Sequence, residues 1–501
     1  MKQLLSILLI TIFNTASAQT FVGEISTPEG FQYMKLEAKA DSTFISFPYE
    51  FRQTFGFNVK AAAGNDFTVK ARAEQRTFTL KKVGSEQMEL TTNFTGTTEL
   101  ITLKKQLAPI EETQLDKYTG NFIDENGNRA IVYVRRGYLH LMSPYAEQTV
   151  SLKPIGQDKF WSTSGETTIF ADNAKNSFQT LSITNRQEQQ IKLKKSHDYS
   201  VKEDWVMVDG DSIYVNIYIP HLKGKKPACL LLPGGGGQSQ VENFEYEARF
   251  FAAHGMVAMT FDKASVGKSK GQSFEHYTFK EKALRYQQLI DFLKSNVDVD
   301  PKKVGIHGPS EGGRLALMMG INLGSDLAFI NATAAPLMTP IEGQLYAANH
   351  YSRNIGMTEE DIVSTLMIWK NYYSGILKEK IDTTNFATIR ELRAKYNRAF
   401  LPPTSEIIPL SPKAEDLIDN SVVTEANKLN SPVFLQYGEN DERVNPMGSL
   451  QNFYQNISER LDVTAEVYKR GNHSMMTPEF QICSGYAYDK VKWLKTIGII
   501  E

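Results

Sequence analysis

Cysteine is scarce in this sequence: Cys229 and Cys483 are the only two among 501 residues. Two cysteines so far apart cannot build the disulfide framework of a small stapled domain. We expect both to be buried as small apolar side chains, with a single bridge between them as the alternative. No histidine–cysteine spacing fits a zinc site. The sequence therefore predicts no metal site and no cofactor.

An excess of charge of one sign is missing as well, since 55 Lys and Arg face 57 Asp and Glu. With this balance the chain has no excess positive charge that would attract nucleic acid or an anionic membrane surface. No later hydrophobic run reaches the ~18 residues that a membrane-spanning helix needs. We expect no nucleic-acid partner and no membrane span, so function must come from local sites.

The first eighteen residues have the layout of a signal peptide. Lys2 supplies a positive start, residues 4–13 form an apolar run, and Ala16-Ser17-Ala18 has the small residues of a cleavage site. A buried N-terminal helix is the alternative interpretation. We expect residues 1–18 to be removed, the mature chain to begin at Gln19, and the protein to be exported to the periplasm or the extracellular space.

Residues 20–198 alternate apolar and polar side chains. Segments such as "TVKARAEQRTFTLKKV" (68–83) and "AIVYVRRGYLHLM" (130–142) have the period of two that is typical of half-buried antiparallel strands. We expect two β domains, 20–106 and 107–198. The second begins "LDKYTGNFIDENG" and resembles the lipocalin-like β domains attached to some secreted hydrolases. Neither contains a catalytic constellation.

From residue 199 onward the pattern changes to strands that alternate with long helices, which is typical of a mostly parallel sheet covered by helices. "PACLLLP" (227–233) is a continuous apolar run, as expected of a strand buried on both faces. We predict an α/β domain over 199–501 with a helical insertion at 337–430. The insertion is either scaffold or a lid, and Trp369, Tyr372 and Tyr373 are candidates to line an acyl or aromatic pocket.

The stretch "VGIHGPSEGGRLALMMG" (304–320) runs a short apolar strand into G-x-S-x-G and then into a helix. This is the setting in which a nucleophilic serine sits on a sharp turn. The flanking glycines are needed because Cβ atoms would collide in so tight a turn. We therefore predict that Ser310 is a nucleophile and not an ordinary polar residue between a strand and a helix.

A serine hydroxyl needs a base and an orienting acid, in the chain order serine, acid, histidine for this setting. Only His473 follows both the serine and a suitable acid, while His350 falls within the insertion. Asp441 lies three residues after Gly438, just past an apolar strand, which is the spacing expected of the acid. Glu439 and Glu442 are the alternative candidates for this role. The sequence predicts a triad of Ser310, Asp441 and His473.

An oxyanion intermediate also needs backbone donors. One is the N–H of Glu311, directly after the serine, and the other comes from the loop after the third strand. "LLPGGGGQS" occupies that place, and four glycines let a backbone approach a ligand closely, although a flexible loop is the alternative. We predict Gly235 as the second donor.

These segments together resemble the serine α/β-hydrolases of the dienelactone-hydrolase, acyl-CoA-thioesterase and prolyl-oligopeptidase-like branch. The residues that carry the resemblance are "PGGGG", "TFDKASVGKSKG", "VDPKKVGIHGPSEGG", "GENDERV" and "GNHSMM". The chain departs from this branch at Ala264-Ser265, where many members have Arg-Gly. The resemblance implies an α/β-hydrolase fold over about residues 200–501.

Three functions remain open from the sequence. The first is an exported carboxylesterase that acts on a small-molecule ester or acyl substrate through an acyl-enzyme on Ser310. The second is a prolyl-oligopeptidase-like serine peptidase or an acyl thioesterase, although residues 20–198 are too few for the β-propeller that such peptidases usually carry. The third is a non-enzymatic binding protein with a degenerate hydrolase domain. A complete triad in the required order favours an enzyme.

Overall fold

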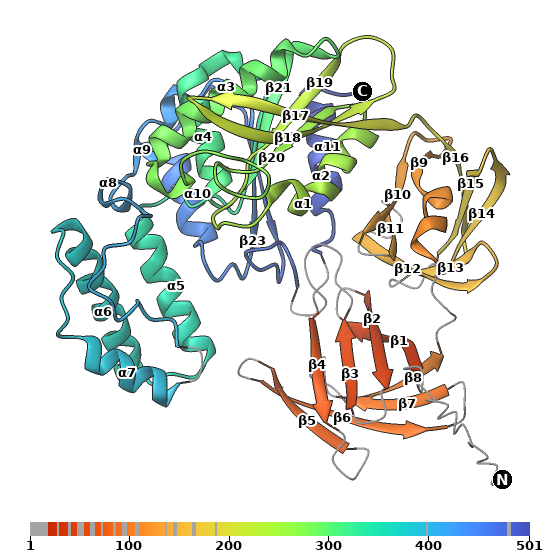
Figure 1. The fold of residues 1–501 in the computed structure, drawn as a ribbon, viewed down its shortest axis with the longest axis horizontal. Coiled ribbons are helices and arrows are strands. Elements are labelled where there is room, and N and C mark those ends of the chain that lie inside the picture. Colours follow the sequence, from red (N-terminus) through yellow and green to blue (C-terminus); the bar gives the residue numbers. More distant parts are fainter. Residues whose placement is uncertain are drawn as a thin grey trace, which may run out of the picture. The chain divides into compact units, whose positions relative to one another are not determined.

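The computed structural model describes the strands between residues 19 and 105 and, with short gaps at 136–137, 144–147, 163–166, 186–187, 397–398 and 478–481, residues 110–501. The chain divides into two compact units near residue 110. The predicted signal peptide, 1–18, lies outside the described residues. Figure 1 shows the fold, coloured along the sequence.

The first unit contains an eight-stranded sheet in the order β4-β3-β2-β1-β8-β7-β6-β5. The paired strands are antiparallel, as the period-two pattern predicts. The strands are β1 (Gln19–Thr27), β2 (Gly30–Ala38), β3 (Ser42–Phe47), β4 (Phe55–Lys60), β5 (Asp66–Ala71), β6 (Glu74–Lys82), β7 (Gln87–Thr92) and β8 (Glu99–Lys105).

A closed antiparallel barrel follows, in which each strand pairs with the next and the last pairs with the first. Its strands are β9 (Gly120–Ile123), β10 (Arg129–Arg135), β11 (Tyr138–Ser143), β12 (Gln148–Gly156), β13 (Lys159–Ser162), β14 (Thr167–Ala174), β15 (Ser177–Thr184) and β16 (Gln190–Lys195). Apolar side chains from alternate positions fill its interior, among them Phe122, Phe160 and Phe170.

The rest of the chain builds an eight-stranded sheet in the order β17-β18-β20-β19-β21-β22-β23-β24. From β20 to β24 in this order all neighbours are parallel, while the β17–β18 hairpin joins the edge antiparallel. The strands are β17 (Tyr199–Val208), β18 (Asp211–Pro220), β19 (Lys226–Leu231), β20 (Val257–Phe261), β21 (Val299–Pro309), β22 (Ile330–Thr333), β23 (Val433–Gly438) and β24 (Val463–Tyr468). This confirms the mostly parallel α/β architecture.

Helices cover both faces of this sheet (Figure 1). The helices of this part of the chain are α1 (Gln240–Asn243), α2 (Glu245–Ala253), α3 (Phe279–Ser295), α4 (Glu311–Leu323), α5 (Pro340–Asn354), α6 (Glu359–Leu377), α7 (Phe386–Lys395), α8 (Ala414–Leu417), α9 (Ser421–Thr424), α10 (Pro446–Tyr454) and α11 (Tyr486–Thr496), of which α5 to α9 belong to the insertion between β22 and β23. Strand β19 shows why both faces are apolar: Leu230 packs in the core with α3 and α4, whereas Cys229 and Leu231 pack with α2 and α11.

The barrel packs against the sheet domain through residues that point out of the barrel. Ala130 and Val132 of β10 face the barrel interior, so the alternating Ile131 and Tyr133 face outward. These two form a buried cluster with Phe250 of α2 and further residues of α2, β11 and α11. The barrel and the sheet domain therefore share an apolar interface.

The insertion between β22 and β23 forms a group of helices, drawn in teal in Figure 1. Helix α5 begins with Pro340 and a capping box of Thr339 and Glu342, which satisfies the first N–H groups of the helix. Helices α5, α6 and α8 enclose a core of their own. Near the end of the insertion, Val422 and Val423 of α9 pack instead in the main core beside α4.

Both cysteines are buried thiols outside any disulfide, Cys229 in the sheet core and Cys483 near the C-terminal helix. Among the residues that the structure describes, none of the helices combines the length and apolarity required to cross a membrane. In that same part of the chain, no group of His, Cys, Asp or Glu side chains is arranged to hold a metal ion.

Candidate active site

Ser310 lies on a sharp turn between the end of β21 and the start of α4. Its φ of 56° and ψ of −122° are outside the regions that a residue with a Cβ normally adopts, so the turn is strained. Hydrogen bonds hold the turn in place: Ser310 N donates to the Thr333 carbonyl at 2.8 Å, and Gly313 N and Arg314 N donate to the Ser310 carbonyl.

The two glycines of G-x-S-x-G are required by close backbone contacts. A Cβ at Gly308 would lie 2.5 Å from the carbonyl carbon and oxygen of Gly312, and a Cβ at Gly312 would lie 2.6 Å from the Leu232 carbonyl oxygen. Real Cβ atoms essentially never approach other atoms so closely. These contacts press the turn against the end of β19, where the glycine-rich loop begins.

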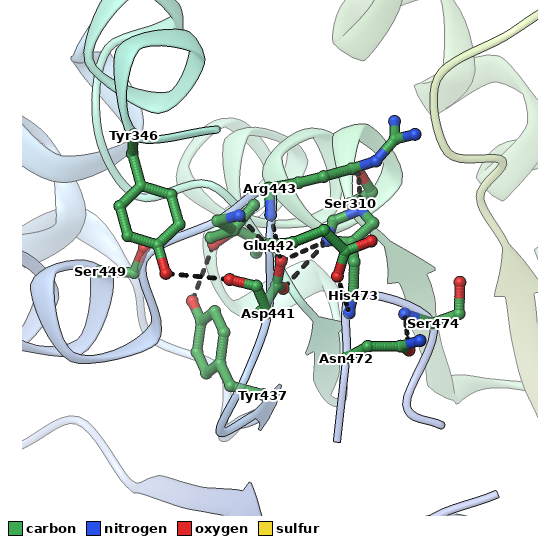
Figure 2. Close-up of polar contacts among 12 residues, drawn as sticks. Ser310, Tyr346, Tyr437, Asp441, Glu442, Arg443, Ser449, Asn472, His473 and Ser474 are labelled. Carbon is green, nitrogen blue, oxygen red and sulfur yellow. Dashed lines mark hydrogen bonds and ion pairs between the residues drawn. The ribbon is translucent and has the colours of Figure 1, made fainter. Parts of the chain in front are cut away.

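The structure brings Ser310, His473 and Asp441 together (Figure 2). His473 Nε2 lies 3.0 Å from Ser310 Oγ, and Nδ1 lies 3.0 Å and 2.9 Å from the two carboxylate oxygens of Asp441. Asp441 is fully buried, and its Oδ1 also accepts hydrogen bonds from the backbone N–H groups of Arg443 and Val444. This chain of contacts can move a proton from the serine to an imidazole that the carboxylate orients.

The two acids that compete with Asp441 in sequence bind backbone groups instead. Glu439 accepts a hydrogen bond from Arg470 N at 2.9 Å, and Glu442 accepts one from His473 N at 3.1 Å. In these contacts both carboxylates hold the loop that carries the histidine. Asp441 is the acid whose carboxylate lies within hydrogen-bond range of the imidazole, and it is placed there by its position three residues after Gly438 at the end of β23.

The glycine-rich loop 234–237 lies beside the turn, as predicted. A Cβ atom added at Gly234 would lie 3.7 Å from Ser310 Cβ. One added at Gly235 would lie 3.6 Å from a carboxylate oxygen of Glu311. The N–H of Glu311 opens α4, and the first N–H groups of a helix have no acceptor within the helix. A backbone site for an anion can form here, while the choice of Gly235 as donor stays a prediction.

A sequence profile described as "serine aminopeptidase, S33" matches residues 224–479, just over half of the chain. The chain belongs to this family. The S33 assignment confirms the predicted α/β-hydrolase fold and makes the protein a hydrolase. It covers the strands and loops from β19 to the histidine loop.

Two curated proteins resemble parts of this S33-family hydrolase. The thiohydrolase apmlB of Arthrinium phaeospermum is 30% identical over 119 residues, which cover 24% of this chain and 38% of apmlB. The esterase FrsA of Serratia proteamaculans is 22% identical over 318 residues, covering 62% of this chain and 72% of FrsA. Among solved structures, an esterase of Pyrobaculum calidifontis aligns with 60% of this chain and 86% of its own, at 16% identity and a TM-score of 0.41.

The S33-family hydrolase holds its glycine-rich loop through Asp262, which follows β20. The carboxylate Oδ1 accepts hydrogen bonds from Ser239 Oγ at 3.0 Å, Gln240 N at 2.7 Å and Val241 N at 3.2 Å. Asp262 is buried. It therefore fixes the end of the loop at the start of α1.

The insertion also contacts the site, through residues that sequence reasoning missed. Tyr346 of α5 donates its hydroxyl hydrogen to the backbone carbonyl of Asp441 at 2.9 Å, and Tyr351 donates to Glu442 at 3.4 Å. Burial raises the pKa of Tyr346, and the charges of Asp441 and Glu442 raise it further, so the hydroxyl remains a donor. Helix α5 thereby braces both the acid and, through Glu442, the histidine loop (Figure 2).

Buried Arg314 connects the serine helix to the insertion. It lies four residues after the serine, and its guanidinium donates to the Met338 carbonyl where the insertion begins and to Asp419 near its end. No motif marks Arg314 in the sequence, because its partners lie far along the chain. Both ends of the insertion are thus tied to the helix that follows Ser310.

The predicted pocket-lining aromatics are instead part of the insertion's own core. Trp369 and Tyr373 are buried and stack with ring centroids 5.5 Å apart, and Trp369 Nε1 donates to the Phe400 carbonyl at 3.0 Å. Tyr372 is half-buried against the same cluster. Aromatic residues at helical spacing pack here among helices, so this structure supports the scaffold interpretation of these three side chains.

Proposed function

We propose that this hydrolase cleaves carboxylic esters of small molecules through an acyl-enzyme on Ser310. The observation that carries the proposal is the continuous contact from Ser310 Oγ through the His473 imidazole to the buried carboxylate of Asp441. A serine on a strained turn has no structural need for such a partner. It does need one to become a nucleophile at neutral pH.

In the proposed reaction, Ser310 Oγ attacks the ester carbonyl while His473 Nε2 accepts the hydroxyl proton. The backbone N–H groups of Glu311 and Gly235 bind the oxyanion of the tetrahedral intermediate. His473 then gives the proton to the leaving alcohol oxygen, which departs and leaves the acyl group on Ser310. A water molecule, activated by the same imidazole, releases the acid and restores the serine.

The β-structure that precedes the hydrolase domain favours an ester over a peptide as the substrate. The described strands between residues 19 and 195 form an antiparallel sheet and a closed barrel, whereas the prolyl-oligopeptidase type carries four-stranded propeller blades. The similarity to FrsA, named an esterase, supports the same choice. A thioester is the second candidate, because apmlB is named a thiohydrolase. The same acyl-enzyme chemistry would serve either substrate.

A substrate panel tests this proposal. Purified protein should hydrolyse p-nitrophenyl acetate and its longer homologues faster than an acyl thioester series or aminoacyl p-nitroanilides. A fluorophosphonate should label the protein at Ser310, and Ser310→Ala should prevent labelling and lower kcat by roughly 10⁴- to 10⁶-fold. Labelling at another residue, or near-normal turnover by Ser310→Ala, would refute the proposed nucleophile. Faster turnover of thioesters would move the assignment to a thioesterase.

We also propose that the hydrolase is exported after removal of residues 1–18. The support is the positive start, apolar run and small-residue cleavage site in the sequence. Identification of the mature N-terminus tests this part separately from the chemistry.

A further inference from the structure

Lys263 is a buried lysine that contacts the glycine-rich loop directly. It follows Asp262 at the end of β20, only 1% of its surface is exposed, and its Nζ donates to the Gly236 carbonyl at 3.0 Å. The Nζ also lies 4.2 Å from the ring centroid of Phe274. The carbonyl that it holds belongs to the residue next to Gly235, the predicted oxyanion donor.

The surroundings of Lys263 form a compact charged cluster under the start of α4. Glu311, the residue after the serine, accepts a hydrogen bond from Lys282 of α3 at 3.1 Å, and the Lys282 side chain is almost fully buried. Burial raises the pKa of Glu311, but Lys282 and Lys263 lower it more, so this carboxyl is ionised. Glu275, from the short 3₁₀ helix before α3, is the other acid that acts on Lys263. The charges of two ammonium groups therefore act on one half-buried carboxylate, and Lys282 contacts it directly.

This contact matters because four consecutive glycines have more conformational freedom than any other tetrapeptide. Asp262 fixes the end of the loop at α1, but it does not reach the middle. At Gly236 the backbone has a φ of 96°, one of the many conformations that glycine adopts without strain. The hydrogen bond from Lys263 to Gly236 holds this middle part.

We propose that Lys263 is a positioning residue of the oxyanion hole, whose ammonium group holds the Gly236 carbonyl and thereby aims the N–H of Gly235 at the reacting carbonyl. The proposal rests on the ester hydrolysis proposed above. A misplacement of about 1 Å at a reacting centre costs roughly 100-fold in rate. The loop geometry that Lys263 maintains therefore affects turnover more than it affects substrate binding.

The same contact predicts a pH effect. Burial lowers the pKa of Lys263 to about 8, and the charge of Lys282 lowers it as well, while Glu311 and Glu275 oppose the change. Below this pH the ammonium makes a charge-assisted hydrogen bond to Gly236, about twice as strong as that of a neutral amine. Above it the neutral amine still donates, but more weakly. Turnover should therefore decline above about pH 8 to a lower plateau.

The test compares Lys263→Met, Lys263→Gln and the matched control Lys268→Met in hydrolysis of p-nitrophenyl acetate from pH 6 to 10. Lys268 lies in the same segment, but its side chain is exposed and pairs with Glu203. We expect Lys263→Met to lower kcat by about 100-fold with KM changed less than about threefold. Lys263→Gln keeps a donor that does not titrate, so it should lose about tenfold and show no decline above pH 8.

Each outcome bears on the proposal. Lys268→Met should keep both the wild-type rate and the alkaline decline. Wild-type kcat in Lys263→Met, or an unchanged alkaline decline in Lys263→Gln, would overturn the positioning role while leaving the ester hydrolysis intact. If Lys263→Met does not fold in a thermal unfolding experiment, Lys263→Gln alone decides through its pH profile. A wild type that hydrolyses no ester would instead refute the proposed function.

Discussion

Replacing Asp441 by asparagine tests the proposed triad with almost no change of shape. The carboxylate Oδ1 accepts two backbone hydrogen bonds, from Arg443 N and Val444 N, both at 2.8 Å. An asparagine side chain has one acceptor oxygen and one donor nitrogen. Because both backbone donors need an acceptor, the amide oxygen should occupy the Oδ1 position and the NH₂ group the Oδ2 position, 2.9 Å from His473 Nδ1.

This orientation decides the tautomer of the imidazole. The amide oxygen, 3.0 Å from Nδ1, already accepts two backbone hydrogens, so the NH₂ group 2.9 Å from Nδ1 favours a lone pair on that nitrogen, and the ring hydrogen moves to Nε2. Nε2 lies 3.0 Å from Ser310 Oγ and can then no longer accept the serine proton. The analogous change in a serine protease costs about 10⁴-fold in kcat. We expect a similar loss here, which corresponds to about 5.4 kcal/mol of transition-state stabilisation.

The assay is steady-state hydrolysis of p-nitrophenyl acetate at neutral pH, with thermal unfolding measured on the same samples. Asp441→Asn should unfold near the wild-type temperature, since both backbone donors keep their acceptor. Glu439→Gln is the matched control: Glu439 lies in the same loop and accepts only from Arg470 N among its described contacts, so kcat should stay within about twofold. An Asp441→Asn variant that keeps more than a tenth of wild-type kcat would show that the carboxylate does not set the tautomer.

Four further outcomes are expected. Gly312→Ala should lower both the unfolding temperature and kcat in calorimetry and turnover assays, because its methyl group would collide with the backbone after β19; wild-type values would contradict the steric argument. Tyr346→Phe should lower kcat by about three- to tenfold through loss of one hydrogen bond to the Asp441 carbonyl, and an unchanged kcat would show that the brace is dispensable. Trp369→Ala should cost about 3 kcal/mol in denaturant unfolding but leave acyl chain-length preference unchanged, and a changed preference would restore the pocket role. Mass spectrometry of the protein from its native host should find Gln19 at the N-terminus, and an intact leader in the cytoplasm would argue against export.

Much of the fold and the central contacts could be predicted from the sequence, because they depend on local periodicity and chain order. The alternation of apolar and polar side chains over 20–198 predicts antiparallel strands. The apolar strand, the G-x-S-x-G motif and the helix around Ser310 together predict the sharp turn that carries the serine. The carboxyl ends of parallel strands meet at one edge of a sheet, so residues just after β21, β23 and β24 lie together. His473 could be chosen because it is the one histidine that follows both Ser310 and Asp441 in the sequence.

The supporting residues could not be predicted, because their partners are distant in the chain and their types are common. Lys263 and Lys282 are two of many lysines, and only the folded chain shows that their charges act on Glu311. Tyr346 lies on α5, and the spacing of apolar residues in this helix does not show which of its side chains face the active site. Trp369 packs in the insertion's own core, and the sequence does not show this because helical periodicity identifies a buried face without revealing what that face is buried against.

The contacts of α5 have a consequence for how enzymes of this kind diversify. Helical insertions are natural places to vary substrate preference, since they tolerate substitution without disturbing the sheet. Here, however, Tyr346 and Tyr351 attach the insertion to the acid and histidine loops. Exchanging the insertion with that of a relative would therefore change rate along with specificity, unless the two tyrosines are carried over. Selection on substrate range and selection on turnover act in this protein on the same helix.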